Sequence, residues 1–281
     1  MILVFGKSGQ VAQELQHQGD VMAFGRDDVD LMLPGAAKAA IDRHKPRLVI
    51  NAAAYTAVDK AEDDEAAAHQ LNAVAPGEMA LACADLGCPF LHISTDYVFD
   101  GSGQSPWREN DPVAPLGVYG RTKLAGEEAV RAANGHHAIL RTSWVFSAHG
   151  GNFVKTMLRL SETRDALNVV GDQIGGPTPA ADIAATLLEM GHQMQAGHAG
   201  GTYHYGGQPS VSWADFARAI FDQAGRDMRV TDIPSSDYPT PACRPFNSRL
   251  DCSKLKTDFN IAAPDWTVGL TAVLKNLETN S

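Results

Sequence analysis

Short apolar runs alternate with helix-like segments throughout the first half of the chain. The runs predict strands over 2–5, 21–25, 47–54, 89–95 and 137–146, with helices over 36–46, 60–87 and 119–134. Because these strands are apolar at nearly every position, both of their faces should be covered. The alternation predicts an α/β fold, a Rossmann-type doubly wound parallel sheet, in which helix 60–87 breaks near Pro76.

The second half has a less regular pattern. Helices are predicted over 152–162, 180–194 and 213–225, a strand over 201–207, and a proline-rich stretch runs from Pro234 to Pro245. This irregularity predicts a smaller substrate-binding lobe that closes over a ligand. No clear linker separates the halves, so we expect them to be intertwined. Residues 1–145 would form mainly the dinucleotide-binding domain, and residues 146–281 mainly the lobe, with segments that return to the first domain.

Composition and charge narrow the class of partner. Of 281 residues, 44% are hydrophobic and 20% are charged, which is typical of a soluble globular protein. The net charge of −10, with no basic cluster, disfavours nucleic acid and an anionic membrane as partners but permits a small anionic ligand. The N-terminal strand lacks the features of a signal peptide, and the four cysteines form no C-x-x-C pair. We therefore expect a cytoplasmic protein with reduced thiols.

The stretch GKSGQVA at 6–12 carries the first chemical signal. It follows a strand and opens a helix, with Gly6, Gly9 and Ala12 in a G-x-x-G-x-x-A pattern. A plain tight turn could show the same letters, but this position favours a dinucleotide site, where backbone N–H groups and the helix dipole meet a pyrophosphate. The expected cofactor-binding residues are Gly6, Ser8, Gly9, Gln10, Val11, Arg26, Asp30, Leu31, Ala52, Ala53, Ala54, Tyr55, Thr56, Tyr119 and Lys123.

The end of the second strand, FGRDD, bears on the choice of cofactor. Arg26 falls where the adenosine ribose should lie, and a guanidinium suits the 2′-phosphate of NADPH. Asp27 or Asp28 turned inward would instead bind the ribose hydroxyls and permit NADH. Arg26 could also be a solvated surface charge. Asp30 is a candidate for the adenine edge, and the sequence leaves the cofactor preference open.

Three further residues suggest proton transfer. Tyr119 and Lys123 share one helix face at i and i+4, and Thr95 ends a predicted strand. A nearby ammonium and a nicotinamide cation would lower the pKa of a phenol, so that it exchanges a proton near neutral pH. The threonine hydroxyl would polarise the same substrate oxygen. Y-x-x-x-K alone is a weak signal, but its combination with the glycine loop and Thr95 is specific.

These motifs resemble the extended short-chain dehydrogenase/reductases and, within them, the dTDP-4-dehydrorhamnose reductases. The similarity spans essentially the whole chain and rests on the segments FGKSGQVAQEL, NAAAYTAVDKAE, STDYVFDG, VYGRTKLAGE, RTSWVF and YPTPACRPFNSRL. The resemblance implies hydride transfer from NADPH or NADH to C4 of dTDP-4-dehydro-β-L-rhamnose, a nucleotide-sugar substrate. It leaves the nucleotide base and the oligomeric state, monomer or weak homodimer, open.

The resemblance also implies roles for individual residues. Tyr119 would donate the proton, Lys123 would be its electrostatic partner, and Thr95 would help to lower the tyrosine pKa. The expected substrate-binding residues are Thr95, Asp96, Trp144, Arg244 and Asn247. Arg244 is assigned from its charge to a substrate diphosphate, with a structural ion pair as the alternative.

Other activities in the same superfamily remain open. Sugar-nucleotide dehydratases typically carry Thr-Asp-Glu at the strand end, whereas this chain has Thr95, Asp96 and Tyr97. Tyr97 therefore argues against dehydration. Epimerisation would use the same tyrosine, lysine and threonine. The regulatory subunit of methionine adenosyltransferase also resembles this subfamily, so a non-catalytic NADP-binding role is a further alternative.

A metal is a weaker expectation. Some members of the resembled family are described as Mg²⁺-dependent, with a carboxylate-held ion between two subunits, and Glu14 matches one such carboxylate. The other matching positions hold Ala181 and Asn276, poor ligands for Mg²⁺, although Asp182 and Glu278 lie nearby. Mg²⁺ is therefore doubtful. The histidines at 92, 136, 137 and 204 share no ligand spacing and predict no metal site.

Overall fold

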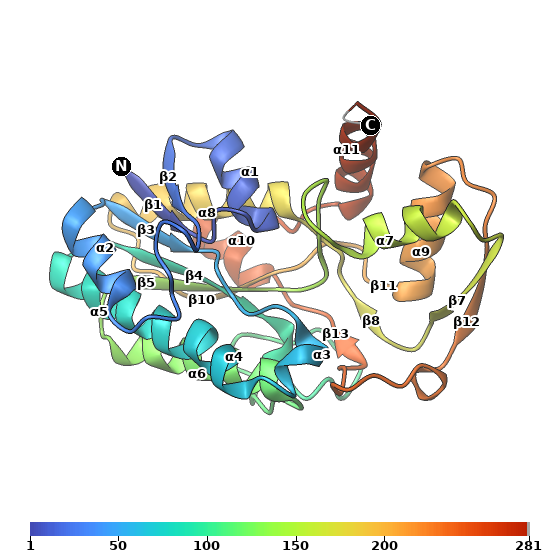
Figure 1. Ribbon diagram of the computed structural model, residues 1–281, viewed down its shortest axis with the longest axis horizontal. Coiled ribbons are helices and arrows are strands. Elements are labelled where there is room, and N and C mark those ends of the chain that lie inside the picture. The colour runs from blue at the N-terminus through green and yellow to red at the C-terminus, as the bar shows by residue number, and fades with distance from the viewer. Residues whose placement is uncertain (280–281) are drawn as a thin grey trace.

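The computed structural model describes residues 1–279 and is built around a six-stranded sheet (Figure 1). The strand order is β10–β5–β4–β3–β1–β2, and every pairing is parallel. The strands are β1 (Ile2–Phe5), β2 (Val21–Phe24), β3 (Leu48–Asn51), β4 (Phe90–Thr95), β5 (His137–Thr142) and β10 (Gly201–Tyr205). The predicted α/β class with a doubly wound parallel sheet is confirmed.

Alternate residues of these strands face two apolar layers, as a sheet covered on both faces requires. One layer joins the sheet to α1 (Gln10–Gln18), α8 (Ala180–Gln195) and α10 (Ser253–Phe259). The other joins it to α2 (Ala36–His44), α5 (Ala75–Leu86) and α6 (Val118–Ala132). On β1, for example, Val4 faces the first layer, while Leu3 and Phe5 face the second.

The predicted helix over 60–87 is interrupted at a different place from the one expected. It is divided earlier, into α3 (Val58–Ala61) and α4 (Glu65–His69), and then runs through the π-helical segment η1 (Gln70–Val74) into α5. Pro76 lies in the first turn of α5. Proline has no N–H to donate to the preceding turn, and the π-helical segment η1 ends directly before α5 begins.

Most of the second half forms a smaller lobe with its own apolar core, at the right of Figure 1. Its helices are α7 (Phe153–Ser161), α9 (Trp213–Gln223) and α11 (Trp266–Thr279). Its short strands are β6 (Val145–Phe146), β7 (Ala166–Val170), β8 (Ile174–Gly175), β9 (Thr178–Pro179), β11 (Val211–Ser212), β12 (Arg229–Ile233) and β13 (Asn247–Ser248). The 3₁₀ turns η2 (Asp96–Val98) and η3 (Ser235–Asp237) complete the described elements.

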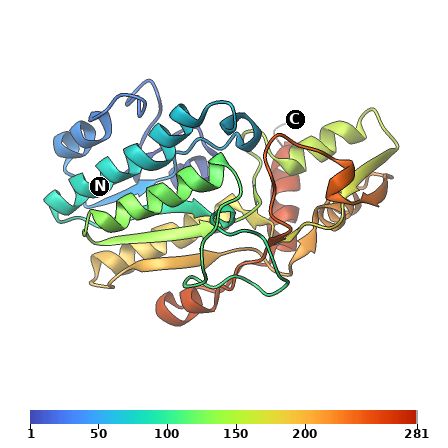
Figure 2. The same cartoon turned by 90° about the horizontal axis from the view of Figure 1, so that it is seen from below.

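The two halves of the chain are interleaved in space. Strand β10 forms the edge of the main sheet beside β5 (Figure 2). Helix α8 packs against α1. The chain therefore leaves the main sheet after β5, returns for α8 and β10, leaves again for α9, and comes back for α10. Within residues 1–279, the helices are all too short or too polar to cross a membrane.

Candidate active site

One long cavity of about 1050 Å³ lies at the carboxyl ends of the sheet strands and extends to the smaller lobe. In open α/β sheets this edge is where ligands bind. All the residues that the sequence assigns to the cofactor line the cavity. Thr95, Asp96, Trp144 and Arg244, which the sequence assigns to the substrate, line it as well.

The glycine loop brings backbone to the cavity wall. Gly6 has a φ of +104°, and a Cβ at this residue would lie 2.7 Å from the Ala53 nitrogen, so only glycine fits. Gly9 is the N-cap of α1 and supplies no capping side chain. The first N–H groups of the helix, which lack intrahelical acceptors, therefore remain available to an anion.

At the end of β2 the structure separates the competing charges. Arg26 lines the cavity with its side chain 78% exposed, and its Nε lies 3.8 Å from Asp30 Oδ1. Asp28 points elsewhere: its Oδ2 accepts the Gly25 N–H at 2.9 Å and lies 3.4 Å from Lys7 Nζ. The hydrogen bond from Gly25 lowers the pKa of Asp28, so this carboxylate is stabilised in its local turn. Of Arg26, Asp27 and Asp28, Arg26 is the one that lines the cavity, and Asp30 lines it as well.

Tyr119 lies in the first turn of α6 and lines the cavity beside the end of β4. Its ring meets that of Tyr97 edge-on, with centroids 5.3 Å apart. Burial raises the pKa of the Tyr119 phenol, and a hydrogen bond with Thr95 opposes that rise only in part. The phenol is therefore held in the protonated form, which is the form that can donate a proton. The lowered pKa expected from the sequence depends on the nicotinamide cation as well as the ammonium, so it stays a prediction for the cofactor complex.

Lys123 lies one turn further along α6, where its ammonium contacts the backbone of β4. Its Nζ donates to the Ile93 carbonyl at 2.7 Å and lies 3.3 Å from His92 Nε2. Asn51 Oδ1 accepts the Ala53 N–H, which turns Asn51 Nδ2 toward His92 Nδ1 at 3.1 Å. The neutral His92 ring must then carry its proton on Nε2, facing the lysine.

This contact has an electrostatic consequence for the lysine. Burial, together with the charge of Lys123, holds the pKa of His92 well below its ordinary value, so the ring is neutral. Burial also lowers the pKa of Lys123 to about 8. The charge of Glu127 acts against this fall. The sequence analysis missed His92 as a neighbour of Lys123, because nothing in the letters relates a strand residue to a helix residue 31 positions later.

Asp96 and Thr142 present unsatisfied polar atoms at the cavity. Asp96 Oδ2 and Thr142 Oγ1 are buried without a hydrogen-bond partner among residues 1–279. Burial raises the pKa of Asp96 to about 6, although hydrogen bonds from Ser248 and Thr95 act against the rise. Buried polar atoms are normally satisfied, so these two mark places where a ligand hydroxyl would bond.

The smaller lobe adds aromatic surface to the cavity. The Trp144 ring stacks on that of Trp213, with centroids 3.5 Å apart and an interplanar angle of 11°. Both line the cavity, together with Phe153. Sequence reasoning missed Trp213 and Phe153, whose only signal is an aromatic residue in the first turn of a helix. Flat apolar walls of this kind suit a sugar or base ring.

Arg244 forms a structural ion pair, the alternative considered for it, and its contact with a diphosphate stays a prediction. It lines the cavity, and its Nη2 also donates to Asp59 Oδ2 at 2.7 Å in an ion pair. Its Nη1 lies 3.4 Å from the Tyr97 hydroxyl. Tyr97, which stands where a dehydratase carries glutamate, therefore belongs to the cavity wall, and burial raises its pKa to about 12.

The structure places Asn247 away from the cavity lining, contrary to its expected substrate contact. Its side-chain amide is used inside the protein, where Nδ2 donates to the carbonyls of Ser102 and Ser105 at 3.2 and 2.8 Å. Its Oδ1 accepts from Arg249 Nη1 at 3.0 Å. Asn247 thus holds the loop that follows β4, because a buried amide needs partners.

Glu14 lies in a donor set that does not fit Mg²⁺. Its Oε1 is 3.2 Å from His149 Nε2, and His17 is the third member of the group. Ala181 has no side-chain oxygen, and the nearby Asp182 supplies one further carboxylate, whose pKa is raised by burial and by the charge of Glu14. Mg²⁺ requires an octahedral shell of oxygen ligands. Two imidazoles beside one carboxylate are the ligands of a softer ion. No step of the chemistry below therefore uses Mg²⁺.

Comparison with known proteins identifies the family. The family model described as the RmlD substrate binding domain matches residues 1–279. A dTDP-4-dehydrorhamnose reductase of Sinorhizobium fredii (strain NBRC 101917 / NGR234) is 44% identical over 94% of this chain and 93% of its own length. That of Escherichia coli (strain K12) is 40% identical over 100% of this chain and 99% of its own.

Solved structures agree with this result. The Bacillus anthracis str. Ames dTDP-4-dehydrorhamnose reductase in complex with NADP has a TM-score of 0.93 and 32% identity, and the match covers 98% of each chain. The resemblance inferred from the motifs is confirmed: the chain belongs to the RmlD family, that of the dTDP-4-dehydrorhamnose reductases.

Proposed function

We propose that this protein reduces the C4 carbonyl of dTDP-4-dehydro-β-L-rhamnose to the alcohol of dTDP-L-rhamnose. The observation that carries the proposal is a single cavity that joins the glycine loop at one end to Thr95, Tyr119 and Lys123 at the other. Its volume of about 1050 Å³ leaves room for a dinucleotide and a second ligand, and aromatic side chains of the smaller lobe line it as well. The four free cysteines fit a reducing cytoplasm.

The reaction requires one hydride and one proton. The glycine loop would hold the dinucleotide, which would supply the hydride to C4 when bound. The Tyr119 hydroxyl would supply the proton to the carbonyl oxygen as the C=O bond becomes an alcohol. The phenol is protonated at neutral pH, as a donor must be, because the ordinary pKa of a tyrosine is about 10. The Thr95 hydroxyl, hydrogen-bonded to Tyr119, orients it and stabilises negative charge on the substrate oxygen. Lys123, held by Ile93, would be the electrostatic partner of the tyrosine.

The remaining cavity residues orient the sugar nucleotide in this proposal. Asp96 Oδ2 and Thr142 Oγ1 would bond to sugar hydroxyls, because both are buried and unpartnered within the described chain. The stacked Trp144 and Trp213 would cover an apolar face of a ring. Arg244, which forms an ion pair with Asp59, would also bind the diphosphate.

A direct assay tests the proposal. Purified protein, mixed with NADPH and dTDP-4-dehydrorhamnose, is expected to consume NADPH and form dTDP-L-rhamnose in equal amounts, with or without a chelator. A protein that binds NADPH without turnover would instead be a non-catalytic binding subunit. Interconversion of two sugar nucleotides with no net NADPH consumption would indicate an epimerase. Either outcome contradicts the proposed reduction.

We propose NADPH as the preferred cofactor, since Arg26 faces the cavity and Asp28 is engaged with Gly25 and Lys7. Arg26→Ala should therefore raise the Kd for NADPH by about 10- to 100-fold, the scale of hydrogen bonds to a charged group, and leave the Kd for NADH almost unchanged. Fluorescence titration with each cofactor measures both constants. Arg43→Ala, an exposed arginine on α2 outside the cavity lining, is the matched control. Equal losses for the two cofactors would show that Arg26 does not bind the 2′-phosphate.

A further inference from the structure

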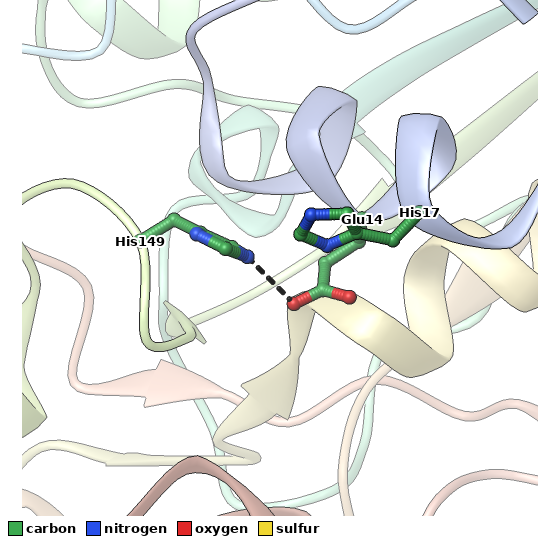
Figure 3. Close-up of side chains that lie close together, drawn as sticks. All are labelled: Glu14, His17 and His149. Carbon is green, nitrogen blue, oxygen red and sulfur yellow. Dashed lines mark ion pairs between the residues drawn. The ribbon is translucent and has the colours of Figure 1, made fainter. Parts of the chain in front are cut away.

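Three potential metal ligands meet where the smaller lobe touches α1. Glu14 and His17 lie at i and i+3 on one face of that helix, and His149 comes from the loop between β6 and α7 (Figure 3). Their ligand atoms all lie within 4.8 Å of one another. Figure 3 shows the three side chains turned toward a common point. None of the three lines the large cavity.

The donor types and spacing fit one class of ion. Two imidazole nitrogens and one carboxylate oxygen suit Zn²⁺, which takes three protein ligands and leaves a fourth position for water. Zinc–ligand bonds of about 2.0–2.1 Å place the ligand atoms of a tetrahedral site roughly 3.4 Å apart. Glu14 Oε1 and His149 Nε2 are 3.2 Å apart, and the two histidine rings have centroids 5.3 Å apart. The Glu14–His149 pair already has the spacing of two tetrahedral ligands, and the remaining ligand distances, all within 4.8 Å, would shorten by side-chain rotation.

The loop that carries His149 is already fixed to α1 by other contacts. Ser147 Oγ donates to Gln10 Oε1 at 2.8 Å, and Asn152 Nδ2 donates to the same oxygen at 3.0 Å. Ser147 Oγ also accepts the His149 N–H at 3.0 Å. The side chains of Glu14 and His149 are only 15% and 22% exposed. Glu14 and His149 are thus restrained before any ion binds, which reduces the entropy lost on binding, whereas His17 is exposed and would be ordered by the ion.

We propose that Glu14, His17 and His149 bind a Zn²⁺-class ion that fastens the 147–152 loop to α1. Gly150, Gly151 and Asn152 of this loop line the cavity, as do Gln10 and Val11 at the start of α1. An ion at this point would therefore stabilise the cavity edge where the glycine loop lies, without touching the reacting atoms. The site requires a single chain, and it does not depend on the proposed reaction.

Metal titration of the tag-free, chelator-treated protein tests the site. A Cys243→Ser background removes the one exposed cysteine of the described chain as a competing thiol. Calorimetry should show one Zn²⁺ per chain, and His149→Ala or His17→Ala should weaken binding by about 100-fold, the loss expected for one ligand of a zinc site. Co²⁺ in the same site should give visible absorption bands that these variants abolish. His192→Ala, an exposed helical histidine elsewhere, should change nothing.

The loop provides a second measurement. Zn²⁺ should slow hydrogen exchange at 147–152 in the parent protein and leave it unchanged in the His17→Ala/His149→Ala variant. Circular dichroism of each metal-free variant verifies that the fold persists. If Glu14→Ala unfolds, Glu14→Gln replaces it, because glutamine keeps the shape of the glutamate side chain. Equal Zn²⁺ affinity in the parent and the double variant would overturn the proposal. So would displacement of Zn²⁺ by equimolar Mg²⁺, which would indicate an oxygen site.

Discussion

Tyr119→Phe is expected to lower kcat for carbonyl reduction by about 10²–10⁴-fold, the usual contribution of a positioned general acid. The variant lacks only the phenolic oxygen, and its ring can keep the edge-on contact with Tyr97. The fold and the affinity for NADPH should therefore be retained. Stopped-flow measurement of NADPH oxidation under single-turnover conditions reports the chemical step directly.

Tyr238→Phe makes the same chemical change on a tyrosine that is 61% exposed, so it should leave kcat unchanged. Calorimetric titration with NADPH verifies that any loss in Tyr119→Phe arises after binding. Retention of more than about a tenth of the parent kcat would remove Tyr119 from the role of proton donor. Thr95, or a water molecule beside it, would then have to supply the proton.

Glu127→Ala is expected to cost about 3–5 kcal/mol of unfolding free energy, the usual loss when one partner of a buried ion pair is removed. Glu127 Oε1 and Oε2 accept from Arg141 Nε and Nη2 at 2.8 and 2.7 Å. The Glu127 side chain is 0% exposed and that of Arg141 only 2%. Without the carboxylate, a guanidinium would remain inside the protein with no counter-charge on its forked face.

Urea unfolding of Glu127→Ala and of Glu128→Ala, the exposed neighbour on the same helix, measures the difference. Replacing both Glu127 and Arg141 by leucine should recover much of the loss, because an apolar pair leaves no charge buried. A Glu127→Ala variant as stable as Glu128→Ala would show that the pair contributes nothing.

The same ion pair gives the stability of the parent protein a pH dependence. Burial raises the pKa of Glu127, but hydrogen bonding and charge from Arg141 lower it more, to a net value below the ordinary 4.5. The stabilisation is therefore fully present above the unfolded value and is lost as pH falls through the folded one. In Glu127→Ala this acid-dependent part should be absent.

Sequence was sufficient for the sheet and for the cavity's cofactor end because both depend on local patterns. Apolar runs locate the parallel strands, and the glycine loop at Gly6 is recognised by its position directly after β1. Tyr119 and Lys123 are related by helix periodicity alone. The substrate end of the cavity is harder to predict, because Trp213 lines it only as a result of how the chain folds within the smaller lobe. That path contains β7 and β12, which the pattern does not predict.

The electrostatics of the site could not be obtained from residue types. A lysine four residues from a tyrosine suggests a lowered phenol pKa, but residue types do not show that Lys123 bonds to Ile93 or that burial opposes the fall at Tyr119. Asn247 looks available in the sequence, but the loop after β4 uses its amide. His149 is more than a hundred residues from Glu14, so no spacing rule relates them. Each case depends on tertiary contacts between distant segments.

The return of the chain to its own sheet affects how this protein is made. A ribosome releases β1 to β5 first, but the edge strand β10 follows only at Gly201–Tyr205. One face of the early sheet has only α1 for cover until α8 is synthesised, and α10 comes later still. A nascent chain halted after β5 would expose that apolar face and an unpaired edge to other chains. Completion of the second half is therefore also what protects the first half from aggregation.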